Sequence, residues 1–281
     1  MTLGNIVSAT GSGLACPDWP LCRGRLIPPL AADVLIEYSH RLAAVAASGL
    51  LVATIVLTLR GSSAPRARRT GIILVVLLGV QIGLGGATVL LKLPHLMSTA
   101  HLVNALLILA GLLMLTTSVR TWAAGDLAVA PRLRRLALAG LAALMLQLAL
   151  GGYVRHSGAG LACPDWPLCS GALFPGHWLA TVHWVHRWLG VALLGLFIHL
   201  ALAARRTSLA TATGIAGVLA ALQVVLGILT VLVGLDPAIR AIHAAAGYAL
   251  WGLLVWVSVT AGAFAAPWGG TPGPERATRA A

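Results

Sequence analysis

The 281-residue chain is 59% hydrophobic and only 9% charged, and its formal net charge is +12. This many polar groups cannot cover the surface of a soluble domain of this length. The composition therefore excludes an ordinary water-soluble protein. Because most basic residues fall between long apolar runs, the positive charge indicates membrane topology and not nucleic-acid binding.

Seven apolar runs follow one another along the chain, each close to the ~20 residues that cross a hydrocarbon core as a helix. A span in lipid must satisfy its own backbone hydrogen bonds, and a single helix does this within one segment. We therefore predict an all-α, polytopic membrane protein. The predicted spans are about residues 34–59, 70–91, 98–119, 136–154, 179–203, 212–233 and 240–264.

The loops between these spans alternate in arginine content. By the positive-inside rule, the arginine-rich loops and the C-terminal tail are expected in the cytoplasm, and the cysteine loops on the outer side of the cell membrane. The arginine-rich set holds 12 of the 19 basic residues: Arg60, Arg66, Arg68, Arg69, Arg120, Arg132, Arg134, Arg135, Arg205, Arg206, Arg276 and Arg279.

An internal repeat divides the chain into two halves. The ten residues 13–22 recur unchanged as residues 160–169, at an offset of 147. This duplication predicts two tandem, pseudo-symmetric helical bundles, a first half of residues 1–125 and a second half of residues 126–265, followed by a cytoplasmic tail, 266–281. Later correspondences, at offsets of 146 and 142, are His40 with His186, Gln81 with Gln223 and His101 with His243.

The repeat predicts eight helices where seven spans are evident. Residues 3–7 match residues 150–154, which end the span at 136–154, so only a stub of the first helix is expected here. Ser8 stands where the second half has Arg155.

All four cysteines lie in the two predicted outer loops, Cys16 with Cys22 and Cys163 with Cys169. Disulfides persist on that side of the membrane, so a disulfide within each loop is favoured. Metal binding is the alternative, but the spacing is too sparse for a zinc site. A thiol oxidoreductase is disfavoured because the loops lack an activated C-x-x-C pair.

Four histidines repeat inside the spans: His40, His101, His186 and His243. Each lies within about two turns of the outer end of its predicted helix, and the two in each half come from helices that run the same way. Opposed imidazoles in a helical bundle are a usual way to hold a haem iron on both faces. Hydrogen bonding between helices is the simpler alternative for any one of them, but the repetition favours iron ligation.

Glu37 is the main asymmetry between the halves, because His183 takes its place in the second half. Its spacing of three residues from His40 puts the carboxylate on the histidine face, where it could accept a proton from a substrate. Pairing with Arg41 one turn later is the alternative. Arg41 and Arg187 could bind haem propionates or extend to the interface. Trp19 and Trp166 fit an interfacial belt or a loop lid.

Several other features are interpreted as architectural. Gln81, Gln147 and Gln223 each precede a glycine four residues later, a pattern that suits close helix packing with an amide hydrogen bond.

The repeated cysteine loops, the Glu37-x-x-His40-Arg41 and His183-x-x-His186-Arg187 motifs, and one later histidine in each half resemble the haem A synthase family. The resemblance covers nearly the whole chain. It implies an oxidoreductase that converts the C8 methyl of haem O to a formyl group by successive hydroxylations, and it identifies both cysteine pairs as disulfides.

On the same resemblance, His40 and His101 address the substrate haem O, His186 and His243 hold a resident haem b, and Glu37 is catalytic. A haem O synthase and terminal oxidase assembly factors are the further partners that it implies. The competing function is a dihaem cytochrome that only carries electrons. Glu37 separates the two, since a pure carrier needs no carboxylate in one half alone.

Overall fold

The computed structural model describes residues 1–62, 64–119 and 131–264. Within these ranges seven helices are long and apolar enough to cross a membrane, which confirms the predicted polytopic, all-α fold. The helices are α1 (Thr2–Ala9), α2 (Ala32–Gly61), α3 (Pro65–Leu90), α4 (His95–Val119), α5 (Pro131–His156), the 3-10 helix η1 (Ala159–Leu161), α6 (Trp178–Ala204), α7 (Ala210–Leu232) and α8 (Pro237–Thr260).

Several helices extend beyond the predicted apolar runs because charged residues continue them. Helix α3 begins at Pro65, five residues before the predicted start, and includes Arg66, Arg68 and Arg69. Proline suits the first turn of a helix and arginine is a good helix former. At the start of α8, the Asp236 carboxylate accepts hydrogen bonds from the backbone N–H groups of Ala238 and Ile239.

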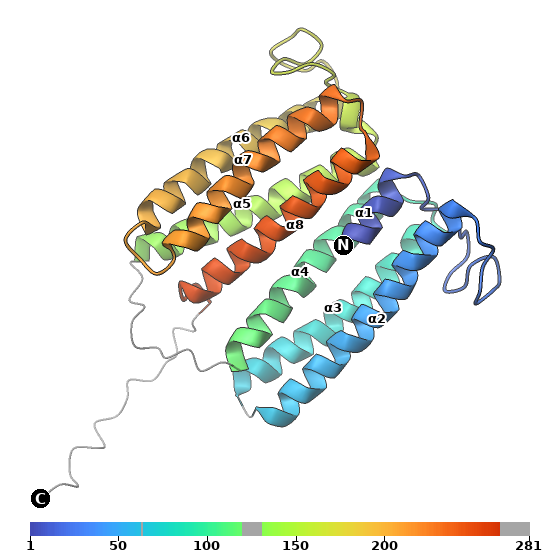
Figure 1. The fold of residues 1–281 in the computed structure, drawn as a ribbon, viewed down its shortest axis with the longest axis horizontal. Coiled ribbons are helices and arrows are strands. Elements are labelled where there is room, and N and C mark those ends of the chain that lie inside the picture. Colours follow the sequence, from blue (N-terminus) through green and yellow to red (C-terminus); the bar gives the residue numbers. More distant parts are fainter. Residues whose placement is uncertain (63, 120–130, 265–281) are drawn as a thin grey trace, which may run out of the picture.

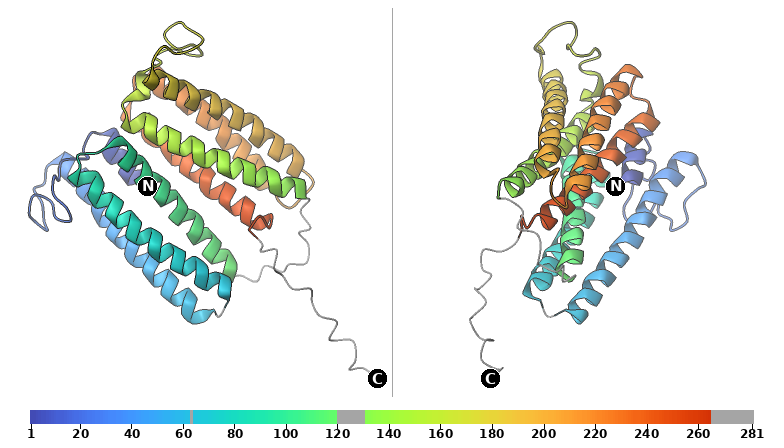
Figure 2. Two further views of the ribbon diagram at one scale, coloured as in Figure 1. Left: turned by 180° about the vertical axis from the view of Figure 1, so that it is seen from behind. Right: turned by 60° about the vertical axis from the view of Figure 1, so that its left-hand side comes forward.

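The seven long helices form two groups that lie side by side (Figures 1 and 2). Helices α2 to α4 make up the first group and α5 to α8 the second, with α4 and α8 in contact between them. The two cysteine loops project from the same end of the molecule, here named the cysteine-loop end. The expected boundary at residues 125 and 126 and the tail 266–281 lie outside the described residues.

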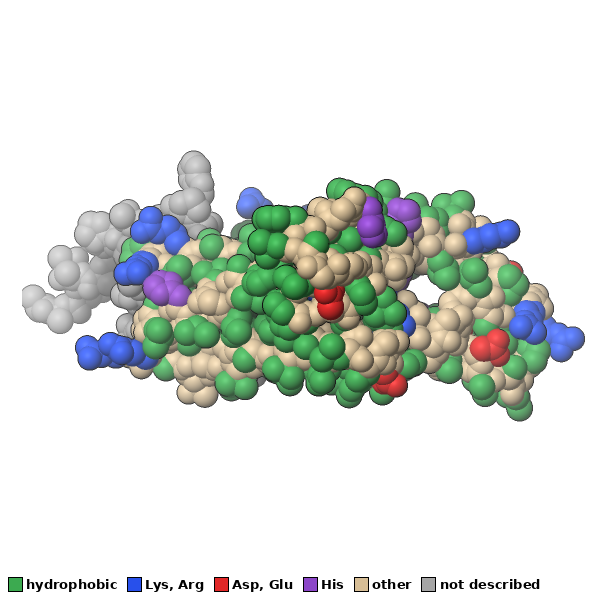
Figure 3. All heavy atoms as spheres, turned by 90° about the horizontal axis from the view of Figure 1, so that it is seen from above, with side chains coloured by type: hydrophobic (Ala, Val, Ile, Leu, Met, Phe, Trp, Pro, Cys, Tyr) green, Lys and Arg blue, Asp and Glu red, His purple; other side chains and the backbone are tan. Residues whose placement is uncertain are grey.

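The second group has the larger apolar core. Phe197, Leu250 and Leu254 are buried at its centre, and Gly140 leaves room for the Phe197 ring. In the first group, α2 exposes many large apolar side chains, and Figure 3 shows apolar side chains over the middle of the molecule with lysines and arginines toward its ends. This distribution suits a lipid surround.

The expected stub of the first helix is present as α1, which packs against α2 and α8. The Asn5 side chain is buried, its amide nitrogen donates to the Arg240 carbonyl oxygen at 3.3 Å, and its amide oxygen accepts from the Arg155 guanidinium. A helix of the first half therefore contacts two helices of the second.

Candidate functional site

The two cysteine loops have the same internal structure. Disulfides join Cys16 to Cys22 and Cys163 to Cys169, the pairing that the sequence favours. In the first loop, the Asp18 carboxylate accepts from the backbone N–H groups of Arg23 at 2.5 Å and Gly24 at 2.7 Å.

The second loop repeats this turn, with Asp165 accepting from Ser170 at 2.6 Å and Gly171 at 2.7 Å. Hydrogen bonds from Gly24 and Gly171 hold the pKa of each aspartate below its usual value, because they stabilise the ionised carboxylate. The contribution to loop order is therefore present above the unfolded aspartate pKa of ~3.9 and is lost as the pH falls through the lower folded value.

Asp18→Asn is expected to loosen the first loop, because an amide offers one acceptor oxygen where the carboxylate offers two. Hydrogen–deuterium exchange at the Gly24 amide should accelerate by about tenfold or more, in line with loss of a charge-assisted hydrogen bond. The Gly171 amide of the unchanged second loop is the internal control. Equal acceleration at Gly171, or none at Gly24, would contradict the expectation.

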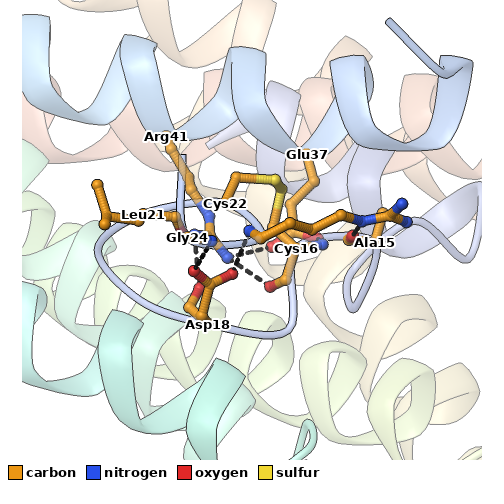
Figure 4. A network of polar contacts seen from close by, with 9 residues as sticks. Ala15, Cys16, Asp18, Leu21, Cys22, Gly24, Glu37 and Arg41 are labelled. Atoms are coloured by element: carbon orange, nitrogen blue, oxygen red, sulfur yellow. Dashed lines mark hydrogen bonds and ion pairs between the residues drawn. A yellow bond between two sulfur atoms is a disulfide. The ribbon is translucent and has the colours of Figure 1, made fainter. Parts of the chain in front are cut away.

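An arginine fixes each loop to the helix that follows it. The Arg41 guanidinium donates to the carbonyl oxygens of Cys16 and Asp18, both at 2.8 Å, and of Leu21 (Figure 4). In the second half, Arg187 donates in the same way to Cys163, Asp165 and Leu168. Both arginines therefore have a loop-binding role that differs from the two roles considered in the sequence.

Glu37 takes part in the same network. The residue is 3% exposed, and its carboxylate accepts from the Cys16 backbone N–H at 2.8 Å and pairs with Arg41 at 2.6 Å. The pairing with Arg41, one of the two alternatives drawn from the sequence, is thus present. A paired carboxylate is also held in one orientation, so the contact fixes the group that the other alternative requires.

His183 replaces Glu37 with weaker contacts. The Cys163 backbone N–H lies 3.4 Å from its Nδ1 atom, and Arg187 Nε lies 3.2 Å from its Nε2 atom. A neutral imidazole accepts a hydrogen bond on only one nitrogen, whereas the Glu37 carboxylate accepts on both oxygens. His183 can therefore accept only one of the two hydrogen bonds that Glu37 accepts in the first half.

The four repeated histidines each pack against a glycine of the preceding helix. A Cβ atom built on Gly4, Gly85, Gly151 or Gly227 would approach Cε1 of the facing imidazole to between 2.8 and 3.5 Å. Gly85, Gly151 and Gly227 were expected to allow close helix packing, and the structure adds Gly4 to the set. The pairs are Gly4 with His40, Gly85 with His101, Gly151 with His186 and Gly227 with His243.

The glutamines behave differently in the two halves. Gln147 and Gln223 donate to the backbone carbonyls of His186 and His243, both at 2.9 Å. Each amide fits over a glycine one turn beyond the histidine, Gly190 or Gly247.

In the first half an alanine, Ala105, stands at that position after His101. Gln81 lies instead with its amide nitrogen 3.2 Å from His101 Nε2, while its oxygen accepts from Asn104 at 2.7 Å. The imidazole of His101 is therefore partly engaged by a neighbouring side chain.

His186 and His243 face one cavity of about 230 Å³ inside the second group of helices. The Nδ1 atoms of both histidines are buried, and they have no hydrogen-bond partner within residues 1–62, 64–119 and 131–264. Trp166 of the second cysteine loop lines the cavity and stacks on Trp188 with ring centroids 5.9 Å apart. This position fits the loop lid considered for Trp166.

Comparison with known proteins identifies the family. A model of the COX15-CtaA family, described as cytochrome oxidase assembly protein, matches residues 1–255. The haem A synthase of Symbiobacterium thermophilum is 33% identical, with 89% of this chain and 87% of that protein covered. For the haem A synthase of Lysinibacillus sphaericus the identity is 30%, with 90% and 88% covered. The chain belongs to the haem A synthase family. It therefore has a role in haem A biosynthesis.

Sequence reasoning missed two residues in this member of the haem A synthase family. Arg155 and Arg240 line the cavity together with Arg187, and all three belong to the cysteine-loop end. Arg155 lies one turn beyond Gly151 and Arg240 one turn before His243. That spacing from a site residue was the available signal, but neither arginine was assigned a role at the site from the sequence.

Proposed function

We propose that this haem A synthase homologue is an oxidoreductase that converts the C8 methyl of haem O to a formyl group by two successive hydroxylations. Written with water as the oxygen source, each hydroxylation replaces a C–H bond with a C–O bond and releases two protons and two electrons, and an external electron acceptor takes up the electrons. Loss of water from the doubly hydroxylated carbon then leaves the formyl group. The observation that supports this proposal is the cavity lined by His186 and His243. The same packing of a histidine ring against a glycine occurs twice in the first half.

The residues of the second half fit a resident haem b. Two buried imidazoles with unpartnered Nδ1 atoms face an otherwise largely apolar cavity, a donor set that suits axial ligation of iron. No group of three or more histidine, cysteine or acidic side chains within the described ranges could hold a bare metal ion. When bound, a haem supplies one-electron redox chemistry.

In the first half, His40 and His101 would bind the substrate haem O. Gln81 occupies His101 Nε2 with a single hydrogen bond, which substrate must displace to reach that nitrogen. Because one hydrogen bond contributes little net free energy, substrate can displace the Gln81 contact on entering, and the contact can form again when the product leaves.

Glu37 would accept the proton that the substrate loses. Arg41 and the Cys16 N–H hold the carboxylate one turn from His40, on the same helix. Because the second half has His183 at this position, the base belongs to the reacting half alone.

The arginine distribution supports a sidedness in which the cysteine-loop end, and with it both haem sites, lies at the outer side of the cell membrane. The reaction requires a haem O synthase that supplies the substrate and assembly factors that pass haem A to a terminal oxidase. These partners are part of the proposal.

The proposal is tested by expressing the chain in cells that make haem O but have no other haem A synthase, then extracting and chromatographing the haems. Haem A is the expected product. An electron-carrying dihaem cytochrome, the competing function, would retain haem b and leave haem O unchanged.

Gly151→Ala is expected to weaken haem b binding in the second half. Its new Cβ atom would lie 2.8 Å from His186 Cε1, so the imidazole must move. Overpacking of this kind costs ~1–3 kcal/mol, and the midpoint of that range corresponds to an affinity about 30-fold lower. Haem titration of the purified protein measures the change.

Gly195→Ala is the matched control, because nothing lies within 4 Å of a Cβ atom built there. That variant should bind haem as the unchanged protein does. Equal haem affinity in both variants would show that the contact between Gly151 and the His186 ring has no part in placing His186.

A further inference from the structure

Two arginines in the second-half cavity carry charges that no carboxylate of the described residues neutralises. Across the described residues, the recorded ion pair joins Glu37 to Arg41, and neither Arg155 nor Arg240 pairs with an acidic side chain. Both contact Asn5, Arg155 through its guanidinium and Arg240 through its backbone carbonyl. Both side chains line the same cavity, and two like charges in a partly desolvated space repel each other and favour an anion between them.

Part of the donor capacity of both guanidiniums is unused, although Arg155 Nη2 lies 3.1 Å from His156 Nε2. Arg155 Nε is buried and has no hydrogen-bond partner in the described part of the chain. Arg240 Nη1 has one long contact, 3.4 Å to the Ala9 carbonyl oxygen. Each guanidinium carries five N–H donors arranged to match a carboxylate, so both arginines have donors available for a ligand.

Their position relative to the histidines is specific. Arg240 precedes His243 by three residues on α8, and both side chains line the cavity. On α5, Arg155 comes four residues after Gly151, the glycine that packs against the His186 ring. Both charges therefore lie one helical turn nearer the cysteine-loop end than the imidazoles.

The first half lacks both charges. At the offset of 147 that relates Gly4 to Gly151, the counterpart of Arg155 is Ser8; at the offset of 142 that relates His101 to His243, the counterpart of Arg240 is Ser98. The Ser98 hydroxyl is buried without a partner. The two sites thus share their histidines and glycines but differ in cationic residues at two matched positions.

We propose that Arg155 and Arg240 bind the propionate carboxylates of the haem in the second-half cavity, and that Ser8 and Ser98 leave the first site without this clamp. This inference rests on the proposed function, since it takes the cavity to hold a haem. The clamp makes the second site a permanent cofactor site, and its absence lets a haem leave the first site.

The first experiment compares haem b with its dimethyl ester, which has the same ring and iron but no carboxylate charges. Apoprotein should bind haem b at least about tenfold more tightly than the ester at the second site, because charge-assisted hydrogen bonds are the stronger ones. In the double variant Arg155→Ser, Arg240→Ser, this ratio should fall toward one. An unchanged ratio would overturn the assignment.

Two further variants keep the test decisive. Arg240→Ser alone removes a guanidinium but keeps the backbone carbonyl that Asn5 binds, so its ratio should fall in a protein with this contact intact. Arg132→Ser, at the other end of α5 and exposed, removes the same charge and should leave the ratio unchanged. A wild-type apoprotein that binds neither compound would refute the proposed cofactor site itself.

Release rates test the role of the serines. With apomyoglobin as the acceptor, haem should leave the first site at least about tenfold faster than the second, and the double serine variant should release haem from the second site at close to the first-site rate. Equal rates from both sites of the unchanged protein would overturn this part of the inference.

Discussion

Glu37→His is expected to lower haem A formation by about 100-fold or more, while the Cys16–Cys22 loop stays folded. Histidine is the residue that the second half uses at this position, where His183 contacts the Cys163 N–H and Arg187. The substitution therefore keeps an anchor for the loop that the molecule itself employs, and it removes only the carboxylate. Positioned general bases contribute ~10²–10⁴-fold in rate.

The measurement is haem extraction from cells that lack another haem A synthase, with haem O, the hydroxymethyl intermediate and haem A quantified against protein. Non-reducing peptide mapping confirms the disulfide. Glu37→Gln should give the same chemical result, and His183→Gln, the pseudo-symmetric control, should reduce haem A far less. Normal haem A formation by Glu37→His would limit Glu37 to holding the loop through Arg41.

His186→Ala and His243→Ala are each expected to abolish the low-spin, six-coordinate spectrum of the retained haem. Both imidazoles face the same cavity, and removal of either leaves the iron with one axial ligand at most. The visible absorption spectrum of purified protein, with haem content by extraction, provides the measurement.

His40→Ala and His101→Ala serve as the matched controls, since these residues have the same glycine contacts in the first half. They should retain the second-half haem and lose haem A formation. An unchanged haem spectrum in His186→Ala or His243→Ala would mean that the halves are assigned the wrong way round.

The fold was predictable because lipid leaves few alternatives. Apolar length and the need to satisfy backbone hydrogen bonds both point to the same seven spans. Local disulfides followed from spacing and compartment. Helix ends were harder to predict, since α3 continues through Arg66, Arg68 and Arg69, where apolarity gives no signal.

The candidate site was only partly predictable. A repeated histidine stands out in a hydrophobic sequence because an ionisable group in a span is costly without a function. Arg155 and Arg240 did not stand out, because an arginine near a helix end usually extends to the interface. Their importance depends on Asn5, a contact between residues 150 and 235 positions apart that no local pattern contains.

Helix α1 has only eight residues, yet two neighbouring residues in it, Gly4 and Asn5, contact the two different candidate sites. Gly4 lies under the His40 imidazole, while Asn5 binds the Arg155 side chain and the Arg240 backbone. The halves are therefore not independent modules, because the second cavity is complete only when the first residues of the chain are in place. A second half expressed alone would lack a wall of its own site.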